Sequence, residues 1–176
     1  MKKAPLFTAA LAALSFSALA ATLVSAWKIA PGYAVTFSTK DAEGRFEQLQ
    51  GEVRFDPADL AGAKFNVTLP VATINTGNGM KNRHAKSRSW FDAATYPDIN
   101  FSSTQVVKTA AGYETSGTLT MHGVTREVTL PFTFTKTASG GTFNGHLEVN
   151  RLDFKIGESG KVGDVVKIDL KVPVTN

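Results

Sequence analysis

"TREVTLPFTF", residues 125–134, alternates polar and apolar side chains over most of its length. Val128, Leu130, Phe132 and Phe134 fall on one face of an extended chain, and threonines and charged residues fall on the other. This period of two is typical of a strand with one buried and one solvated face. Threonine is β-branched and favours strands as well. The stretch therefore predicts a strand that covers an apolar interior.

The same alternation recurs along most of the chain, in residues 33–38, 51–55, 64–69, 98–103, 117–121, 142–150 and 165–174. Turn signals rich in glycine separate these runs, at residues 41–44, 110–112, 121–125, 139–141 and 157–164. The short connections are typical of hairpins. The chain is therefore predicted to be all-β, with about eight strands in one antiparallel meander.

Two segments interrupt the alternation. "DPADLAG", residues 56–62, predicts a single helical turn, with Asp56 as its cap and Pro57 at the first helical position. Residues 78–89 predict a short helical insert that Asn78 caps. Four basic residues and a histidine lie within residues 81–88 of this insert.

The first 26 residues are typical of a secretory signal peptide. Lys2 and Lys3 precede an apolar run, and the small-residue rule allows cleavage after Ala20 or Ala26. No later stretch is apolar enough to form a membrane-spanning helix. We therefore expect a single domain, residues 27–176, in the periplasm of a bacterium.

Charge and cysteine content exclude several classes of protein. Removing Lys2 and Lys3 from 19 basic residues leaves 17 against 15 acidic ones, which is too balanced for a nucleic-acid-binding polycation. The chain has no cysteine, so it cannot use a thiol nucleophile or a cysteine-ligated metal. An exported chain without disulfides must be stabilised by its core.

No convincing catalytic or metal-binding group is found in the sequence. The three histidines, His84, His122 and His146, fall on an insert, a tight turn and an outward strand position, so nothing in the pattern brings them together. Phosphate-loop, nucleophile-elbow and zinc-protease motifs are absent. We expect neither a cofactor nor an enzyme, although an enzyme that uses His84 or His122 as a base on an amphipathic substrate is an alternative, as is a small outer-membrane barrel.

A closed sheet of about eight strands has room inside for packed side chains or for one elongated ligand. Phenylalanines dominate the apolar phases of the strands, and patterning alone fits a packed core as well as a cavity. The residues predicted to contact a ligand in such a lumen are Phe37, Phe55, Phe65, Phe91, Phe101, Leu119, Met121, Phe132, Phe134, Phe143, Phe154 and Ile168.

Several stretches together resemble the YceI family of bacterial secreted proteins. They are "WKIAPGYAVTFSTK" (27–40), "WFDAATYPDINFSST" (90–104), "GTLTMHGVTREVTLPFTF" (117–134) and "NRLDFKIGESGKVGDVVKIDLKV" (150–172). The resemblance covers residues 27–174. It implies a lipocalin-like antiparallel barrel whose lumen holds a long isoprenoid lipid, such as a polyprenyl chain or a quinone, with a helical insert near the entrance. It implies no enzymatic activity.

The insert departs from the family pattern in its charge. Asn82 and Ser89 stand where the family has acidic residues, and Trp90 replaces a phenylalanine. Nearer the C-terminus, Lys155 stands where the family has glycine. The insert is thus more cationic, and the residues predicted to hold a polar or anionic head group are Lys81, Arg83, His84, Lys86, Arg88 and Trp90.

Two other interpretations of the basic insert are open. A run of charges is often only the solvated face of a helix. A basic patch with aromatic residues is also suited to transient contact with anionic membrane lipids. An unpaired edge strand at the barrel seam could in addition pair two copies into a homodimer.

Overall fold

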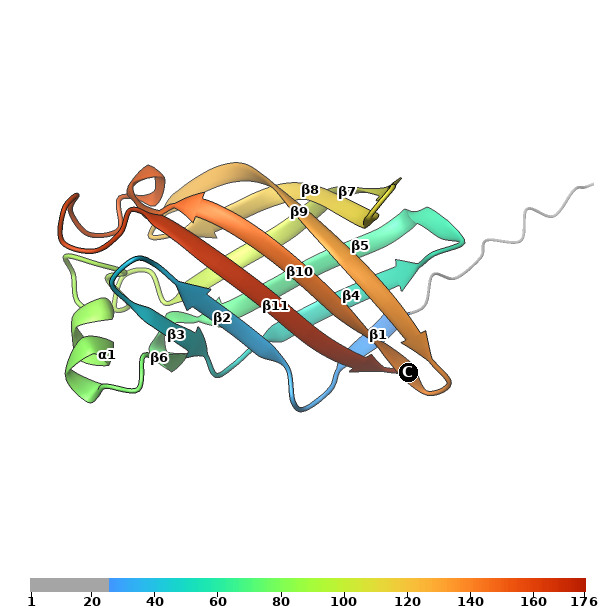
Figure 1. The fold of residues 1–176 in the computed structure, drawn as a ribbon, viewed down its shortest axis with the longest axis horizontal. Coiled ribbons are helices and arrows are strands. Elements are labelled where there is room, and N and C mark those ends of the chain that lie inside the picture. Colours follow the sequence, from blue (N-terminus) through green and yellow to red (C-terminus); the bar gives the residue numbers. More distant parts are fainter. Residues whose placement is uncertain (1–25) are drawn as a thin grey trace, which may run out of the picture.

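The computed structural model describes residues 26–176, which form one β-barrel (Figure 1). The predicted signal peptide, with its cleavage site after Ala20 or Ala26, lies outside the described residues apart from Ala26 itself, where the first strand begins.

Strands make up most of the described chain. They are β1 (Ala26–Ile29), β2 (Ala34–Ser38), β3 (Glu43–Phe46), β4 (Gln50–Asp56), β5 (Asp59–Pro70), β6 (Ile74–Asn75), β7 (Asp98–Thr109), β8 (Gly112–Met121), β9 (Val124–Thr137), β10 (Gly140–Asn150) and β11 (Val165–Thr175). The helical elements are α1 (Gly79–Ala85) and two 3₁₀ turns, η1 (Val71–Thr73) and η2 (Arg151–Phe154).

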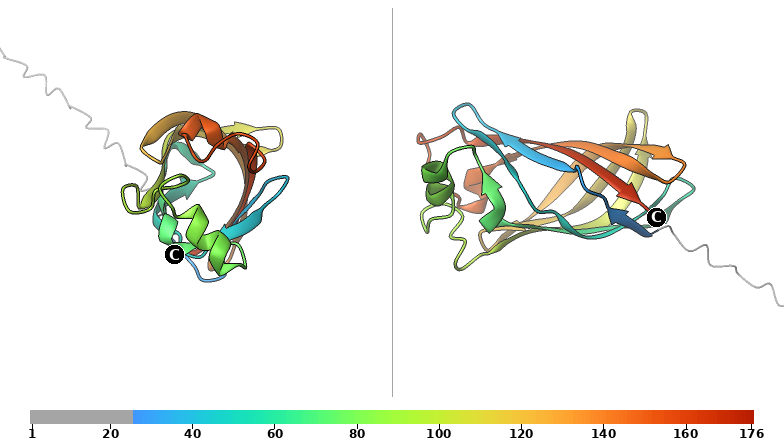
Figure 2. Two further views of the ribbon diagram at one scale, coloured as in Figure 1. Left: turned by 90° about the vertical axis from the view of Figure 1, so that its left-hand side faces the viewer. Right: turned by 90° about the horizontal axis from the view of Figure 1, so that it is seen from below.

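The sheet closes because β1 pairs with both β4 and β11. This gives a ring of eight antiparallel strands in the order β1-β4-β5-β7-β8-β9-β10-β11, which confirms the predicted barrel. The short strands β2, β3 and β6 continue from β11 toward the end at which α1 lies. Figure 2 shows α1 across part of that end, whereas the C-terminus lies toward the other end.

The β8–β9 hairpin has the predicted tight turn. His122 and Gly123 form its two-residue loop with φ values of 49° and 71°, as a type I′ turn requires. The Nδ1 atom of His122 lies 3.1 Å from the carbonyl oxygen of Phe154, and Tyr96 packs edge-on against the imidazole ring. His122 is therefore a turn residue that also ties the hairpin to η2.

The predicted helical turn at residues 56–62 is wrong. Asp56 and Asp59 are paired across a β-hairpin, so only Pro57 and Ala58 form the loop. The Asp56 carboxylate accepts a hydrogen bond from the Ala58 N–H at 2.9 Å. Aspartate followed by proline suits such a turn as well as a helix start, because both use the φ value that proline imposes.

The helical insert is confirmed but is shorter than expected. The Asn78 side chain caps α1 by accepting hydrogen bonds from the N–H groups of Met80 and Lys81. The helix ends at Ala85 rather than near Ser89, and residues 86–97 follow as turns and loop. The positive φ of Asp92, 43°, lies in this return.

The barrel end opposite α1 is filled by an aromatic cluster. Phe55 is fully buried at its centre, with the rings of five other residues at centroid distances of 5.0–6.2 Å. Trp27 lies beside them and donates a hydrogen bond from Nε1 to the Phe55 carbonyl oxygen at 2.7 Å. The five other rings of this cluster belong to Phe65, Tyr113, Phe132, Phe134 and Phe143.

Candidate ligand-binding lumen

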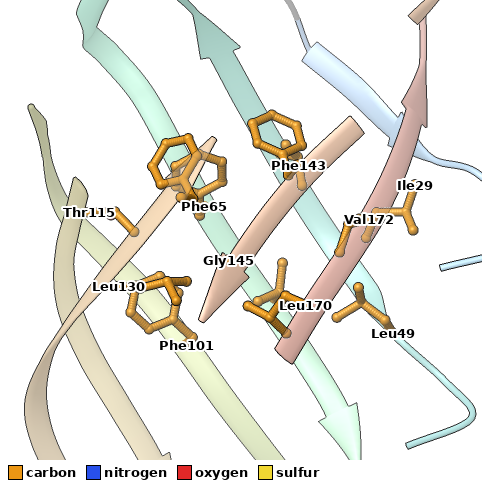
Figure 3. A pocket seen from close by; sticks show the side chains of 13 residues that line it. Ile29, Leu49, Phe65, Phe101, Thr115, Leu130, Phe143, Gly145, Leu170 and Val172 are labelled. Carbon is orange, nitrogen blue, oxygen red and sulfur yellow. The ribbon is translucent and has the colours of Figure 1, made fainter. Parts of the chain in front are cut away.

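Two apolar cavities lie end to end inside the barrel. The deep cavity, next to the aromatic cluster, has a volume of about 100 Å³ (Figure 3), and the upper cavity, toward α1, has a volume of about 150 Å³. Five residues line both cavities, so the two adjoin and together make up the lumen: Leu49, Val67, Phe101, Leu130 and Leu170.

A third cavity, of about 500 Å³, opens the lumen at the α1 end. It shares lining residues with the upper cavity, and α1 contributes Met80, Lys81 and His84 to its wall. We call this third cavity the mouth. The lumen is thus a tube with its entrance under α1 and its far end packed by aromatic rings.

The walls of the tube carry almost no polar groups. In the deep cavity only Thr115 has a polar side chain, and its hydroxyl donates to the carbonyl oxygen of Gln105 at 3.0 Å. In the upper cavity only Thr36 and Arg151 are polar. Such a surface offers apolar contact and few hydrogen bonds, which suits a hydrocarbon chain.

Most of the predicted lumen residues line the tube. Phe65, Phe132 and Phe143 line the deep cavity, and Phe101 lines both. The remaining four of these line the upper cavity: Phe37, Leu119, Met121 and Ile168.

Four predicted lumen residues lie behind the cavity walls. Phe55 and Phe134 pack within the aromatic cluster. Phe154 is buried in η2, and Phe91 packs against the core with its ring centroid 6.4 Å from that of Phe46. Alternation shows which side chains point inward, but the depth of each one depends on strand tilt and on the neighbouring elements, which a single sequence does not reveal.

The predicted set of lumen residues, which consists mainly of phenylalanines, lacks several aliphatic residues of the cavity walls. Leu130 and Leu170 lie on the inward phases that the alternation had already indicated, yet the prediction left them out. Leu49 precedes β4 and belongs to no alternating run, so no signal pointed to it.

The mouth contains only part of the predicted head-group site. Lys81, His84 and Trp90 line it, whereas Arg83, Lys86 and Arg88 do not. Because α1 ends at Ala85, Arg88 no longer follows helical spacing. Arg83 and Arg88 are exposed, and Lys86 lies against the carbonyl oxygen of Ala72 at 3.5 Å.

Arg151 is a rim residue that sequence reasoning missed. Its side chain is buried, and its Nη2 forms a salt bridge of 2.6 Å with Asp164. The same guanidinium donates to four backbone carbonyls of the following loop, those of Ile156, Glu158, Val162 and Gly163. It also lies 5.3 Å from the ring centroid of Trp90. Arg151 therefore joins the loop 155–164 to the insert.

A carboxylate near the mouth has a lowered pKa. The Asn75 side chain donates to Glu47 Oε1 at 2.6 Å and Arg45 donates to the same oxygen at 3.0 Å. These two hydrogen bonds, with that from Asn75 the larger cause, hold the pKa of Glu47 below its ordinary value. The contact ties β6, which leads into α1, to the edge of the sheet.

The histidines are separate, as predicted. His146 points outward and lies 2.8 Å from Asp169, while His84 packs against Trp90 at the mouth. Within residues 26–176 no group of three or more histidine, cysteine, aspartate or glutamate side chains is arranged to hold a metal ion. The same residues contain no helix that is both long and apolar enough to cross a membrane.

A family model described as "YceI-like domain" matches residues 27–174. The chain belongs to this family. This YceI-like protein is 33% identical over 134 residues to a UPF0312 protein of Pseudomonas savastanoi pv. phaseolicola, covering 72% of this chain and 70% of the relative.

Solved structures share the fold. Burkholderia cenocepacia BcnA has a TM-score of 0.77 and 32% identity, covering 82% of this YceI-like chain and 96% of BcnA. A domain from Saccharophagus degradans, described as a polyisoprenoid binding domain implicated in plant cell wall breakdown, has a TM-score of 0.65 and 17% identity, covering 87% of this chain and 99% of that one.

Proposed function

We propose that this protein is a periplasmic binding protein that holds one long isoprenoid lipid, such as a polyprenyl chain or a quinone, in its lumen. The observation that carries the proposal is the apolar tube, open under α1 and filled by aromatic rings at its far end. The structural similarity to the polyisoprenoid binding domain of Saccharophagus degradans supports the same class of ligand. The periplasmic location rests on the N-terminal signal-peptide pattern.

The tail supplies most of the affinity in this proposal. Burying about 500 Å² of apolar lipid surface at about 25 cal/mol per Å² contributes about 12 kcal/mol, before the cost of ordering the chain. The two internal cavities present almost only apolar atoms, so little of this gain is lost to unsatisfied polar groups.

The polar end of the ligand is expected at the mouth. Lys81 and His84 line it and offer donors to a hydroxyl, a carbonyl or an anionic group, and Asp41 is the acidic side chain in the same wall. The protein therefore sets the orientation of the ligand, with the tail inside and the head under α1.

Transient contact with an anionic membrane is our proposal for loading and release. Met80 is 77% exposed, and Arg83 and Arg88 are exposed near it on the insert. Apolar and basic groups together suit the surface of an anionic bilayer. Flotation with vesicles that contain phosphatidylglycerol should fall when both arginines are changed to glutamine, and a matched change of Lys108 and Lys136 should leave it unaltered.

The outer-membrane alternative has less support. A membrane barrel needs an outward apolar band. Among the described residues the exposed large hydrophobic side chains are Met80, Val107 and Val165, and one of these lies on α1 rather than on a strand.

The enzyme alternative makes a different prediction. If His84 or His122 acts as a base, the protein converts the bound lipid into a product, and changing both histidines to glutamine abolishes this conversion. Self-association along an edge strand stays a prediction, which sedimentation velocity would measure.

The proposal is tested by titrating lipid-free protein with an isoprenoid alcohol. Trp90 at the mouth provides a fluorescence signal that should change on binding. The variant Leu147→Trp fills the upper cavity and should abolish binding, whereas Asn144→Trp, exposed on the same strand, should not. Equal binding by both variants would contradict the lumen as the site.

A further inference from the structure

The two internal cavities meet at a ring of apolar side chains that comes from five places around the barrel. One of these five side chains belongs to the residue just before β4, and the other four belong to residues of β5, β7, β9 and β11. We call this ring the collar; it consists of Leu49, Val67, Phe101, Leu130 and Leu170.

The order of residues along β11 shows that the collar separates two compartments. Val172 lines only the deep cavity, Leu170 lines both, and Ile168 lines only the upper one. The aromatic cluster around Phe55 fills the barrel beyond the deep cavity. A ligand that enters at the mouth must therefore pass the collar to reach the deep cavity.

Gly145 lies on β10 near the collar residues Leu130 and Leu170 (Figure 3). Its cross-strand neighbours are Phe132 on β9 and Leu170 on β11. A Cβ atom at this position would lie 3.3 Å from Leu130 Cδ1, 3.3 Å from the carbonyl oxygen of Pro131 and 3.6 Å from Leu170 Cδ1. Glycine thus allows the two collar leucines and the Pro131 backbone to approach β10 more closely than a larger residue would.

The backbone does not require glycine at position 145. This residue is not among the glycines with positive φ, so other residues can adopt its conformation. Glycine inside a strand lowers stability and often marks a close approach of another group. The nearest neighbours of the absent Cβ are the ends of two flexible leucine side chains and the carbonyl oxygen of Pro131, so a larger side chain at this point in the wall of the deep cavity would crowd the collar.

We propose that the collar and Gly145 select the ligand by the length and thickness of its tail. A single slender hydrocarbon chain passes the collar and places its end in the deep cavity, while a shorter chain fills only the upper one. The end of the chain is expected to be apolar, because the other residues that line the deep cavity have no polar side-chain atoms and Thr115 directs its hydroxyl to the carbonyl oxygen of Gln105. This proposal rests on the isoprenoid-binding function proposed above.

The test compares the affinities of three isoprenoid alcohols of increasing length, farnesol, geranylgeraniol and solanesol, for the mature protein. Wild-type affinity should rise with length. Gly145→Leu should weaken solanesol binding about tenfold or more and change farnesol binding less than about twofold, because each excluded CH₂ removes apolar burial. Asn144→Leu, which adds the same side chain on the outside of the same strand, is the control.

A second variant keeps the proposal testable if Gly145→Leu does not fold. Phe132→Leu enlarges the deep cavity without changing the collar and should tighten solanesol binding about threefold, with farnesol unchanged. If wild-type protein binds none of the alcohols, the proposed function fails and this inference fails with it. If wild-type protein binds them, but Gly145→Leu or Phe132→Leu alters all three affinities equally or not at all, only the collar proposal is overturned.

Discussion

Replacing Arg151 by methionine should destabilise the rim of the barrel far more than the loss of an ordinary surface charge. The change keeps much of the volume of the side chain but removes the salt bridge to Asp164 and the hydrogen bonds to the carbonyls of residues 156–163. Removing one partner of a buried ion pair costs about 3–5 kcal/mol. The Asp164 side chain is 33% exposed and can be partly hydrated, so we expect a loss of about 3 kcal/mol.

Thermal unfolding followed by circular dichroism measures this loss. For a domain of this size, about 3 kcal/mol corresponds to a fall in Tm of about 6–12 °C. Trp90 fluorescence should shift as well, because the guanidinium no longer lies over its ring. Arg126→Met is the matched control: Arg126 is exposed, its two hydrogen bonds to Asp153 are 3.4 Å long, and we expect a loss below about 1 kcal/mol.

A loss below about 1 kcal/mol in Arg151→Met would refute this reasoning. A double-mutant cycle with Asp164→Asn separates the ion pair from the carbonyl contacts. We expect a coupling energy above about 1 kcal/mol between the two residues, because their charged groups lie 2.6 Å apart. A coupling near zero would assign the effect of Arg151 to its hydrogen bonds with the loop carbonyls and to packing.

Three further predictions concern stability. Lys155 has a φ of 57°, so Lys155→Gly should raise the free energy of unfolding in urea by about 1 kcal/mol, and an unchanged value would contradict backbone strain at this residue. Phe55→Ala should cost about 3–5 kcal/mol, whereas Leu147→Ala, which faces the upper cavity, should cost less than about 2; equal losses would argue against an open cavity. The pKa of Glu47 is lower in the folded state than its ordinary value of 4.5, so ionised Glu47 stabilises the folded state at pH values above 4.5. This contribution is lost as the pH falls through the lower folded-state pKa. Glu47→Gln should therefore flatten the acid side of a plot of Tm against pH.

Most of the strands were readable from the sequence because each strand has one face toward the lumen and one toward water. The simple meander was wrong at one point: β2 pairs with β11 and β3 rather than with β4, and β1, which no alternating run predicted, closes the ring. The period of two in residues 125–134 is retained in β9, and the turn at His122 and Gly123 has the predicted form. The helical turn at residues 56–62 failed for a physical reason: aspartate followed by proline suits the start of a helix and also the first two positions of a β-turn, and here the chain turns back into a hairpin.

The lumen was only partly predictable. Inward direction follows from alternation, which is why Phe101, Leu119 and Ile168 were identified. Whether an inward-pointing ring lines a cavity or fills the core depends on its position along the barrel axis, which strand tilt determines. Phe143 lines the deep cavity for this reason, whereas Phe55 is fully buried in the aromatic cluster. Arg151 had no sequence signal because its partners are backbone carbonyls of a loop that only the folded chain brings around it.

Native mass spectrometry of the protein purified from its own cells, followed by organic extraction of the bound material, tests the central claim most directly. Our account predicts one isoprenoid or quinone per protein molecule, and the Leu147→Trp variant should be purified without it. A folded wild-type protein that carries no lipid and also binds none of the added isoprenoids would contradict the account. The cavities would then be gaps in the packing of the core, without a role in ligand binding.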